Sequence, residues 1–142
     1  MILVDASLLL YAELDFDPRH PAARGWWDAQ LSGATAVCLC WPVINAFVRI
    51  STQPRAFKKP LLIAEAVERV TAWLQQPPVR LVVPTDEHWG VFAEFLERGQ
   101  ASGNLVSDAE VAALAIEHGC ELQSTDADFS RFPGLKLRNP LA

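Results

Sequence analysis

The sequence has few of the features that mark secreted, membrane or disulfide-stabilised proteins. It contains only three cysteines in 142 residues, and Cys38 and Cys40 are separated by one residue, which is neither disulfide nor zinc spacing. No apolar run approaches the roughly 20 residues that a membrane span needs, and the first residues lack the basic start of a signal peptide. We therefore expect a cytoplasmic protein without a membrane partner, whose cysteines are small core residues.

Positive charge is also scarce. Twelve Lys and Arg stand against seventeen Asp and Glu, which gives a formal net charge of −5. Broad adhesion to a phosphate backbone is driven mainly by Lys and Arg, so this balance argues against it. An acidic excess is also what a carboxylate-built metal site leaves in a composition, so the positions of the acids decide between the two interpretations.

Apolar residues, in contrast, are abundant. They make up 51% of the chain, which includes five Trp and seven Phe, and this composition is far from that of disordered proteins. A chain of this length can bury one sizeable core, and no linker or internal repeat divides it. We predict a single domain over residues 1–142.

Short apolar runs alternate with helical patterns along the chain. The runs that predict strands lie at residues 1–4, 35–40, 79–83, 120–124 and 135–137. The helical patterns lie between residues 17 and 33, from 42 onward, over 63–74, between 85 and 99, and between 107 and 119. This alternation predicts a three-layer α/β/α domain with a mainly parallel five-stranded sheet.

Several of these helices have recognisable ends and faces. Asp17 before Pro18 predicts an N-cap and first turn, and the stretch from Ser107 to Glu110 has the form of a capping box. The third helical pattern carries an apolar stripe of the kind that faces a core, formed by Ile63, Val67, Val70 and Leu74.

Four aspartates stand at strand ends or helix starts. Asp5 ends the first strand, and Asp108 opens the helix that leads into the fourth. Asp126 and Asp128 follow the fourth strand. The ligand crevice of an open parallel sheet lies beyond the carboxyl ends of its strands, so the four acids converge if strands one and four are neighbours.

Converging carboxylates favour a bound cation, because two like charges about 4 Å apart repel by about 4 kcal/mol at an effective dielectric of 20. A site made only of oxygen ligands suits Mg²⁺ or Mn²⁺, and phosphodiester hydrolysis is the natural chemistry of such a site. No protein nucleophile is then required. The sequence indeed lacks a phosphate-binding glycine loop, a nucleophile elbow and an H-E-x-x-H helix.

Each acid also has an ordinary structural explanation. Asp5 can cap the helix that begins near Ser7. Asp108 and Glu110 can complement a helix dipole, and aspartate is common wherever a chain leaves a strand, as at residues 126 and 128. The functional interpretation therefore depends on convergence rather than on any single residue.

Three segments, in order, resemble the motifs of PIN-domain ribonucleases, the VapC-type toxins of toxin–antitoxin systems. They are Val4-Asp5-Ala6-Ser7, Leu105-Val106-Ser107-Asp108-Ala109 followed by Ala112-Ala113-Leu114-Ala115, and Ser124-Thr125-Asp126-Ala127-Asp128-Phe129. The resemblance spans essentially the whole chain. It implies a PIN fold, Mg²⁺- or Mn²⁺-dependent cleavage of RNA, a homodimer, and inhibition by a small VapB-like antitoxin that inserts a segment over the active site.

The resemblance also implies which residues form the site. Asp5, Asp108 and Asp126 match metal ligands, and Asp128 completes the catalytic set. Supporting positions next to these acids are Ser7, Thr125 and Glu110.

One position departs from the family pattern. Most members carry a Glu early in the helix after strand two, where this sequence has Asn45, which can offer a neutral oxygen but cannot act as a base. Arg49 lies four residues further on the same helical face, where it can bind a phosphate or an antitoxin carboxylate.

Three other functions are weighed against the nuclease. A phosphoacceptor receiver module needs a second acid near the first strand and a Lys after the last, but Ala6 and Arg138 stand there. A haloacid-dehalogenase phosphatase needs an Asp at the place of Ser7. A PIN-like domain that binds RNA or a partner without cutting is the main alternative, because of Asn45.

Overall fold

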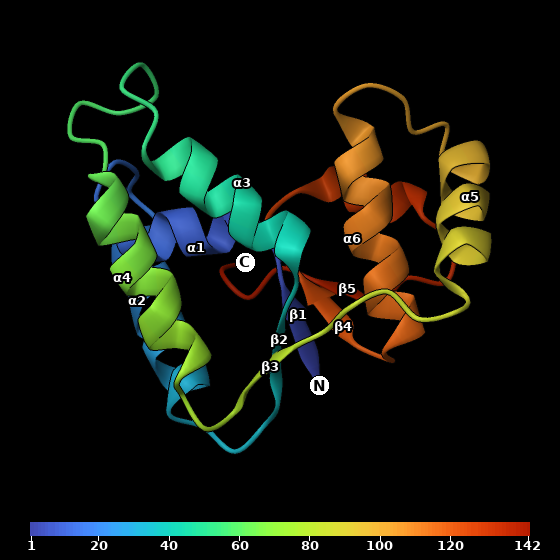
Figure 1. Cartoon of the computed structure of the whole chain (residues 1–142), viewed down its shortest axis with the longest axis horizontal. Helices are drawn as coiled ribbons and strands as arrows, with labels where there is room; N and C mark the ends of the chain where they lie inside the picture. The colour runs from blue at the N-terminus through green and yellow to red at the C-terminus, as the bar shows by residue number, and fades with distance from the viewer.

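Five short parallel strands form a single sheet at the centre of the protein (Figure 1), in a computed structural model that describes all residues, 1–142. They are β1 (Ile2–Val4), β2 (Val37–Leu39), β3 (Val79–Leu81), β4 (Glu121–Gln123) and β5 (Leu137–Arg138). Their order is β3-β2-β1-β4-β5, and every neighbouring pair is parallel. The predicted five-stranded sheet and the adjacency of strands one and four are confirmed.

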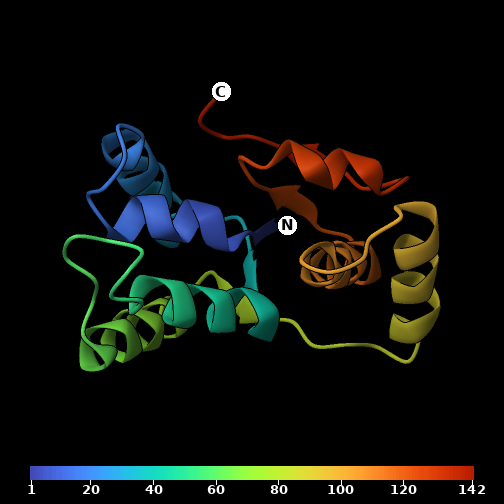
Figure 2. The same cartoon turned by 90° about the horizontal axis from the view of Figure 1, so that it is seen from above.

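Helices cover both faces of this sheet. They are α1 (Ala6–Glu13), α2 (His20–Leu31), α3 (Trp41–Ser51), α4 (Ile63–Leu74), α5 (His88–Arg98) and α6 (Leu105–Glu117), with a 3-10 helix η1 (Ala127–Arg131) after β4. In Figure 2, α1 to α4 lie on one side of the strands and α5 and α6 on the other. The three-layer α/β/α architecture is confirmed. None of the helices has the length and apolar character that crossing a bilayer requires.

The central strands are buried because both of their faces are covered. Leu3, Leu39 and Leu122 have no exposed surface, as expected for a parallel sheet between helical layers. The three cysteines are free and buried, which confirms their role as small core residues. Helix α6 buries nearly its whole central run, from Val111 to Ala115, and so anchors the second layer.

Two predicted helix starts are wrong. The carboxylate of Asp17 accepts a bond from the backbone N–H of Arg19 at 2.8 Å, and α2 begins only at His20, so Asp17 closes a turn before the helix instead of capping it. Helix α6 begins at Leu105, because Gly103 adopts a positive φ of 59° and reverses the chain early. Ser107 is therefore inside the helix, and the capping box is absent.

Of the apolar stripe expected on α4, only Val70 packs against the core, and the other three residues are exposed. Ile63 and Val67 are 61% and 55% exposed, and the buried side chains of the helix are Ala66 and Trp73. Polar contacts explain this rotation. Arg69 and Trp73 both bond the carboxylate of Glu13, which turns this side of α4 inward.

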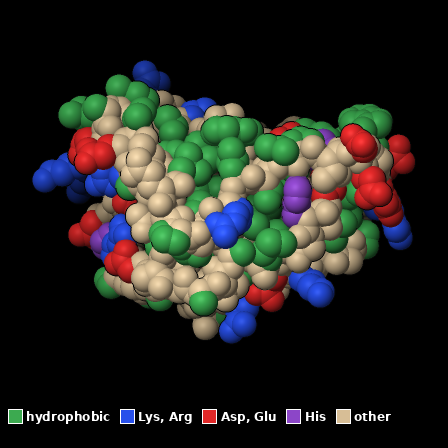
Figure 3. Space-filling model, turned by 60° about the horizontal axis from the view of Figure 1, so that its bottom comes forward, with side chains coloured by type: hydrophobic (Ala, Val, Ile, Leu, Met, Phe, Trp, Pro, Cys, Tyr) green, Lys and Arg blue, Asp and Glu red, His purple; other side chains and the backbone are tan.

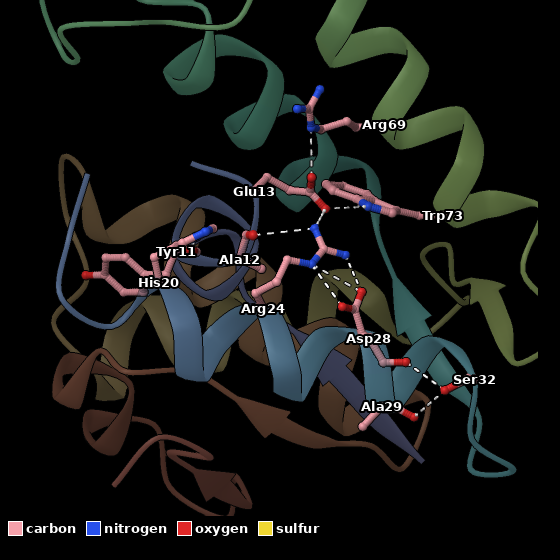
Figure 4. A network of polar contacts seen from close by, with 10 residues as sticks. All are labelled: Tyr11, Ala12, Glu13, His20, Arg24, Asp28, Ala29, Ser32, Arg69 and Trp73. Carbon is pink, nitrogen blue, oxygen red and sulfur yellow. Dashed lines mark hydrogen bonds and ion pairs between the residues drawn. The ribbon is translucent and has the colours of Figure 1, made fainter. Parts of the chain in front are cut away.

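Glu13 at the end of α1 is the centre of a buried polar network that joins three helices (Figure 4). Its carboxylate accepts bonds from Arg24 of α2 at 2.9 Å, from Arg69 of α4 at 2.8 Å and from the Trp73 indole at 3.2 Å. Arg24 in turn pairs with Asp28. The network fixes α1, α2 and α4 relative to one another.

Replacement of Glu13 by Gln tests this network. The Glu13 side chain is buried while its two arginine partners are about a third exposed, so we expect a loss of about 2 kcal/mol, below the range for fully buried pairs. The free energy of unfolding in urea measures this loss. Glu94→Gln is the control, because its pair with Arg98 is exposed and should change stability by no more than about 0.5 kcal/mol. Equal effects would contradict a structural role for Glu13.

Candidate active site

The carboxyl ends of the strands meet at one end of the sheet, where β1 leads into α1 and β4 into η1 (Figure 1). Figure 3 shows the face that holds the amino ends of the strands, and hydrophobic side chains cover much of its middle. The predicted acids belong to the other end. Any acidic site in this fold is therefore at the carboxyl ends of the strands, as the crevice rule for parallel sheets predicts.

Asp5 is held in place by three hydrogen bonds. One carboxylate oxygen accepts from the Ala6 backbone N–H at 2.9 Å, which caps α1. The other accepts from the Ser7 hydroxyl at 3.0 Å and from the Ser124 hydroxyl at 2.7 Å. Burial raises the pKa of Asp5, and these donors only partly offset it. Asp5 can thus cap α1 and belong to the acidic site at the same time.

Asp108 lies in the first turn of α6, and its pKa is raised above the usual range of an aspartate. Burial raises its pKa to about 6, and repulsion from Asp5, Asp126 and Asp128 adds to the shift, while Arg131 opposes it. The four aspartates therefore act on one another electrostatically. The structure brings the acids of β1, α6 and the β4 end into one neighbourhood.

Asp126 and Asp128 follow β4 in a tight turn. The Asp126 carboxylate accepts from the Asp128 backbone N–H at 2.9 Å, and so opens η1. The Asp126 N–H itself donates to the Ser124 hydroxyl at 3.0 Å. Asp128 is exposed, so its carboxylate is accessible to a ligand from solvent.

No lysine or arginine side chain forms an ion pair with these four aspartates, although Arg131 is near enough to Asp108 to oppose the rise of its pKa. The ion pairs of the protein all involve other acids, at Glu13, Asp17, Asp28, Glu94 and Glu117. No three acidic, histidine or cysteine side chains stand close enough to enclose a metal ion by themselves. The four aspartates are thus carboxylates without ion-pair partners, of which Asp128 is exposed to solvent.

The supporting residues predicted from the sequence fall into two groups. Ser7 bonds Asp5, and the Thr125 hydroxyl donates to Ser7 at 3.4 Å, so both lie at the acids. Asn45, Arg49 and Glu110 instead line a hollow of about 330 Å³ between the starts of α3 and α6. Asp108 itself does not line this hollow, but Ser107 and Glu110, close to it on α6, do.

Ser124 is the residue that sequence reasoning missed. It is buried, and its hydroxyl links the Asp5 carboxylate on β1 to the Asp126 backbone after β4. Its place directly after a buried strand and before the Thr125-Asp126 pair was the available signal. A serine in such a position is also an ordinary turn residue, and only the pairing of β1 with β4 reveals its contact.

The whole chain matches one family and several of its members. The model of the PIN domain matches residues 2–135. Ribonuclease VapC37 and Ribonuclease VapC33 of Mycobacterium tuberculosis are 40% and 37% identical over 142 and 141 residues, which cover 100% and 99% of this chain and 99% of each relative. The chain therefore belongs to the PIN-domain family, and within it to the VapC ribonucleases.

Solved structures show the same fold at lower identity. The crystal structure of VapC20 from Mycobacterium tuberculosis, described as a toxin that cleaves the sarcin-ricin loop, has a TM-score of 0.71 at 21% identity, with 98% of this chain and 100% of that chain covered. VapBC-1 from nontypeable Haemophilus influenzae has a TM-score of 0.69 at 16% identity, with both chains fully covered. The predicted PIN fold is thus confirmed.

Replacement of Ser124 by Ala tests the link between the two strand ends. The variant leaves the Asp5 carboxylate with one donor fewer and the Asp126 N–H without its acceptor, so we expect the free energy of unfolding to fall by about 1–3 kcal/mol. Ser130→Ala is the matched control, because that exposed hydroxyl bonds only the Ala127 carbonyl within its own turn. Thermal or urea unfolding measures both. A Ser124→Ala protein as stable as the Ser130→Ala protein would contradict the link.

Proposed function

We propose that this protein is the toxin of a toxin–antitoxin pair and acts as an endoribonuclease that hydrolyses RNA phosphodiester bonds. The observation that carries this proposal is the group of aspartates at the carboxyl ends of β1 and β4, none of which forms an ion pair with a cationic side chain. Relatives named as ribonucleases, which match the chain over its full length, support RNA as the substrate.

A divalent metal ion fits this donor set. Asp5, Asp108 and Asp126 would hold Mg²⁺ or Mn²⁺, which prefer oxygen ligands. Magnesium usually keeps several waters and takes only one or two protein carboxylates together with substrate phosphate, so a fully enclosing cage of three acids is not required. When bound, the ion polarises the phosphate and helps generate hydroxide from water.

The protein's own side chains then orient the Asp5 carboxylate, accept a proton and bind a phosphate of the substrate. Ser7 and Ser124 fix the direction of the Asp5 carboxylate. Asp128, exposed beside Asp126, can accept a proton from the attacking water. Arg49, which has no ion-pair partner in the protein, can bind a phosphate of the RNA strand.

Proteins of similar fold indicate which partners to expect. Structures of similar fold include VapBC-1 from Haemophilus influenzae and VapBC from Salmonella typhimurium bound to DNA, which supports a small VapB-like antitoxin that blocks this site. A homodimer and a cytoplasmic location, where RNA is available, complete the proposal. The alternative of a PIN-like domain that binds without cutting is not favoured, because the relatives that match the whole chain are named as ribonucleases.

Substitutions Asp5→Asn and Asp108→Asn test the site directly. Each removes a charged metal ligand while keeping the shape of the side chain, so we expect RNA cleavage with Mn²⁺ to fall by about 100-fold or more. Cleavage by the unchanged protein should stop when EDTA is added. Asp86→Asn is the matched control, since it makes the same change at an exposed acid that follows β3.

A metal-dependent rise in melting temperature gives a second readout for these variants. We expect Mn²⁺ to stabilise the unchanged protein and the Asp86→Asn protein but not Asp108→Asn, because a ligand that binds only the folded state raises its stability. Cleavage that persists in Asp5→Asn or Asp108→Asn, or in EDTA, would remove the proposed site.

Asn45→Glu tests the departure from the family pattern. The new carboxylate would face the hollow beside the first turns of α6, where it would offer a charged oxygen ligand in place of a neutral one. We expect the cleavage rate to stay the same or to rise by up to about tenfold. Asn45→Gln separates the added length from the added charge. Complete loss of activity in Asn45→Glu alone would show that position 45 does not correspond to the family's glutamate.

A further inference from the structure

The hollow between α3 and α6 contains an exposed tryptophan that the proposed chemistry does not use. Trp41, the first residue of α3, is 49% exposed and lines this hollow together with Arg49 and Glu110. Ser107 and Glu110, which lie on the opposite wall, flank Asp108 on α6. The hollow therefore borders the turn of α6 that carries Asp108, although none of the four aspartates lines it, and any role for it in RNA binding rests on the proposed ribonuclease function.

Trp41 differs from the other four tryptophans in having no aromatic partner. Trp26, Trp27 and Trp73 stack or pack edge to face between α2 and α4, and Trp89 of α5 packs against Phe92. Both neighbours of Trp41 in the chain are fixed, because Cys40 is buried and Pro42 lies in the first turn of the helix. The indole is thus held at the rim of the hollow by a rigid element, with about half of its surface open to a ligand.

The three groups around the hollow match the face of a base, the edge of a base and the phosphate of a nucleotide. An aromatic face stacks a base, and such stacking is the common means by which proteins bind single-stranded nucleic acid. A free arginine binds phosphate, often with two parallel bonds. A carboxylate only accepts hydrogen bonds, so Glu110 favours the N–H donors on the edge of a base. At about 330 Å³ the space is at the lower end of ligand sites, as suits one nucleotide.

We propose that this hollow is a base-recognition subsite, which holds one unpaired nucleotide of the RNA beside the scissile phosphate. The base stacks on Trp41, Arg49 binds its flanking phosphate, and Glu110 accepts hydrogen bonds from its edge. Guanine is the preferred base, because its ring N–H and its amino group present two adjacent donors to one carboxylate. Uracil, with a single donor, fits less well.

Paired substitutions at Trp41 separate stacking from mere apolar contact. Phenylalanine keeps an aromatic face, whereas leucine keeps only apolar surface. With a short single-stranded RNA in EDTA, where no cleavage is expected, we expect Trp41→Leu to weaken binding by about tenfold and Trp41→Phe by less than about threefold. Trp89→Leu, the same change at a tryptophan that is 69% exposed on α5, should bind like the unchanged protein.

Tryptophan fluorescence of the unchanged protein reports RNA binding at Trp41 without the leucine variant. RNA should quench part of the tryptophan emission, and that part should be missing in Trp41→Phe but present in Trp89→Phe. An RNA with an abasic site in place of its single guanine should not quench. Replacement of that guanine by inosine, which lacks the amino group, should weaken binding to the unchanged protein but not to Glu110→Gln.

Cleavage with Mn²⁺ distinguishes failure of this subsite from failure of the nuclease itself. Trp41→Leu should raise KM for guanine-containing RNA by about tenfold and change kcat much less. If Asp108→Asn is inactive while Trp41→Leu binds and cleaves like the unchanged protein, the subsite is wrong and the nuclease stands. If Trp41→Leu loses affinity only for a purified antitoxin, the hollow is a protein contact, and the proposal is overturned. Equal losses in Trp41→Leu and Trp89→Leu would also overturn it.

Discussion

Mutual repulsion among carboxylates at the ends of two neighbouring strands is the constraint on which the rest of the site depends. Asp5 and Asp126 meet because β1 and β4 pair in parallel, and Asp108 joins them from the helix that enters β4. The buried sheet holds these charges together, since separating them would expose Leu3 and Leu122 to water. The free energy of the core thus maintains an arrangement of mutually repelling carboxylates, a repulsion that the proposed cation would relieve.

The sheet and the aspartates could be predicted from the sequence because both depend on local patterns. Short apolar runs that end abruptly at polar residues are typical of buried parallel strands, and the acids at Asp5 and Asp126 mark those ends. The hydroxyl of Ser124 could not be predicted in the same way. Its bond to Asp5 joins residues 119 positions apart, and it exists only because the strands at the two ends of the chain are neighbours.

Helix ends and faces were harder to predict, because several local signals compete. Ser107 and Glu110 satisfy the sequence form of a capping box, yet Gly103 turns the chain earlier and α6 starts before them. On α4 the apolar stripe competes with the bonds from Arg69 and Trp73 to Glu13. Hydrophobic periodicity identifies a helix, but a buried carboxylate elsewhere in the chain decides which of its faces turns inward.

Asn45 illustrates how a neutral residue can suit an acidic cluster. Burial and three neighbouring aspartates already raise the pKa of Asp108 to about 6, so a further carboxylate would add repulsion in the metal-free protein. An asparagine offers an oxygen without that charge. It also lies on the wall of the hollow that holds Trp41 and Arg49, on the side where RNA would approach. One negative charge fewer there lowers the electrostatic barrier to an approaching phosphate, whereas a glutamate at position 45 would add a charged oxygen ligand for a bound cation.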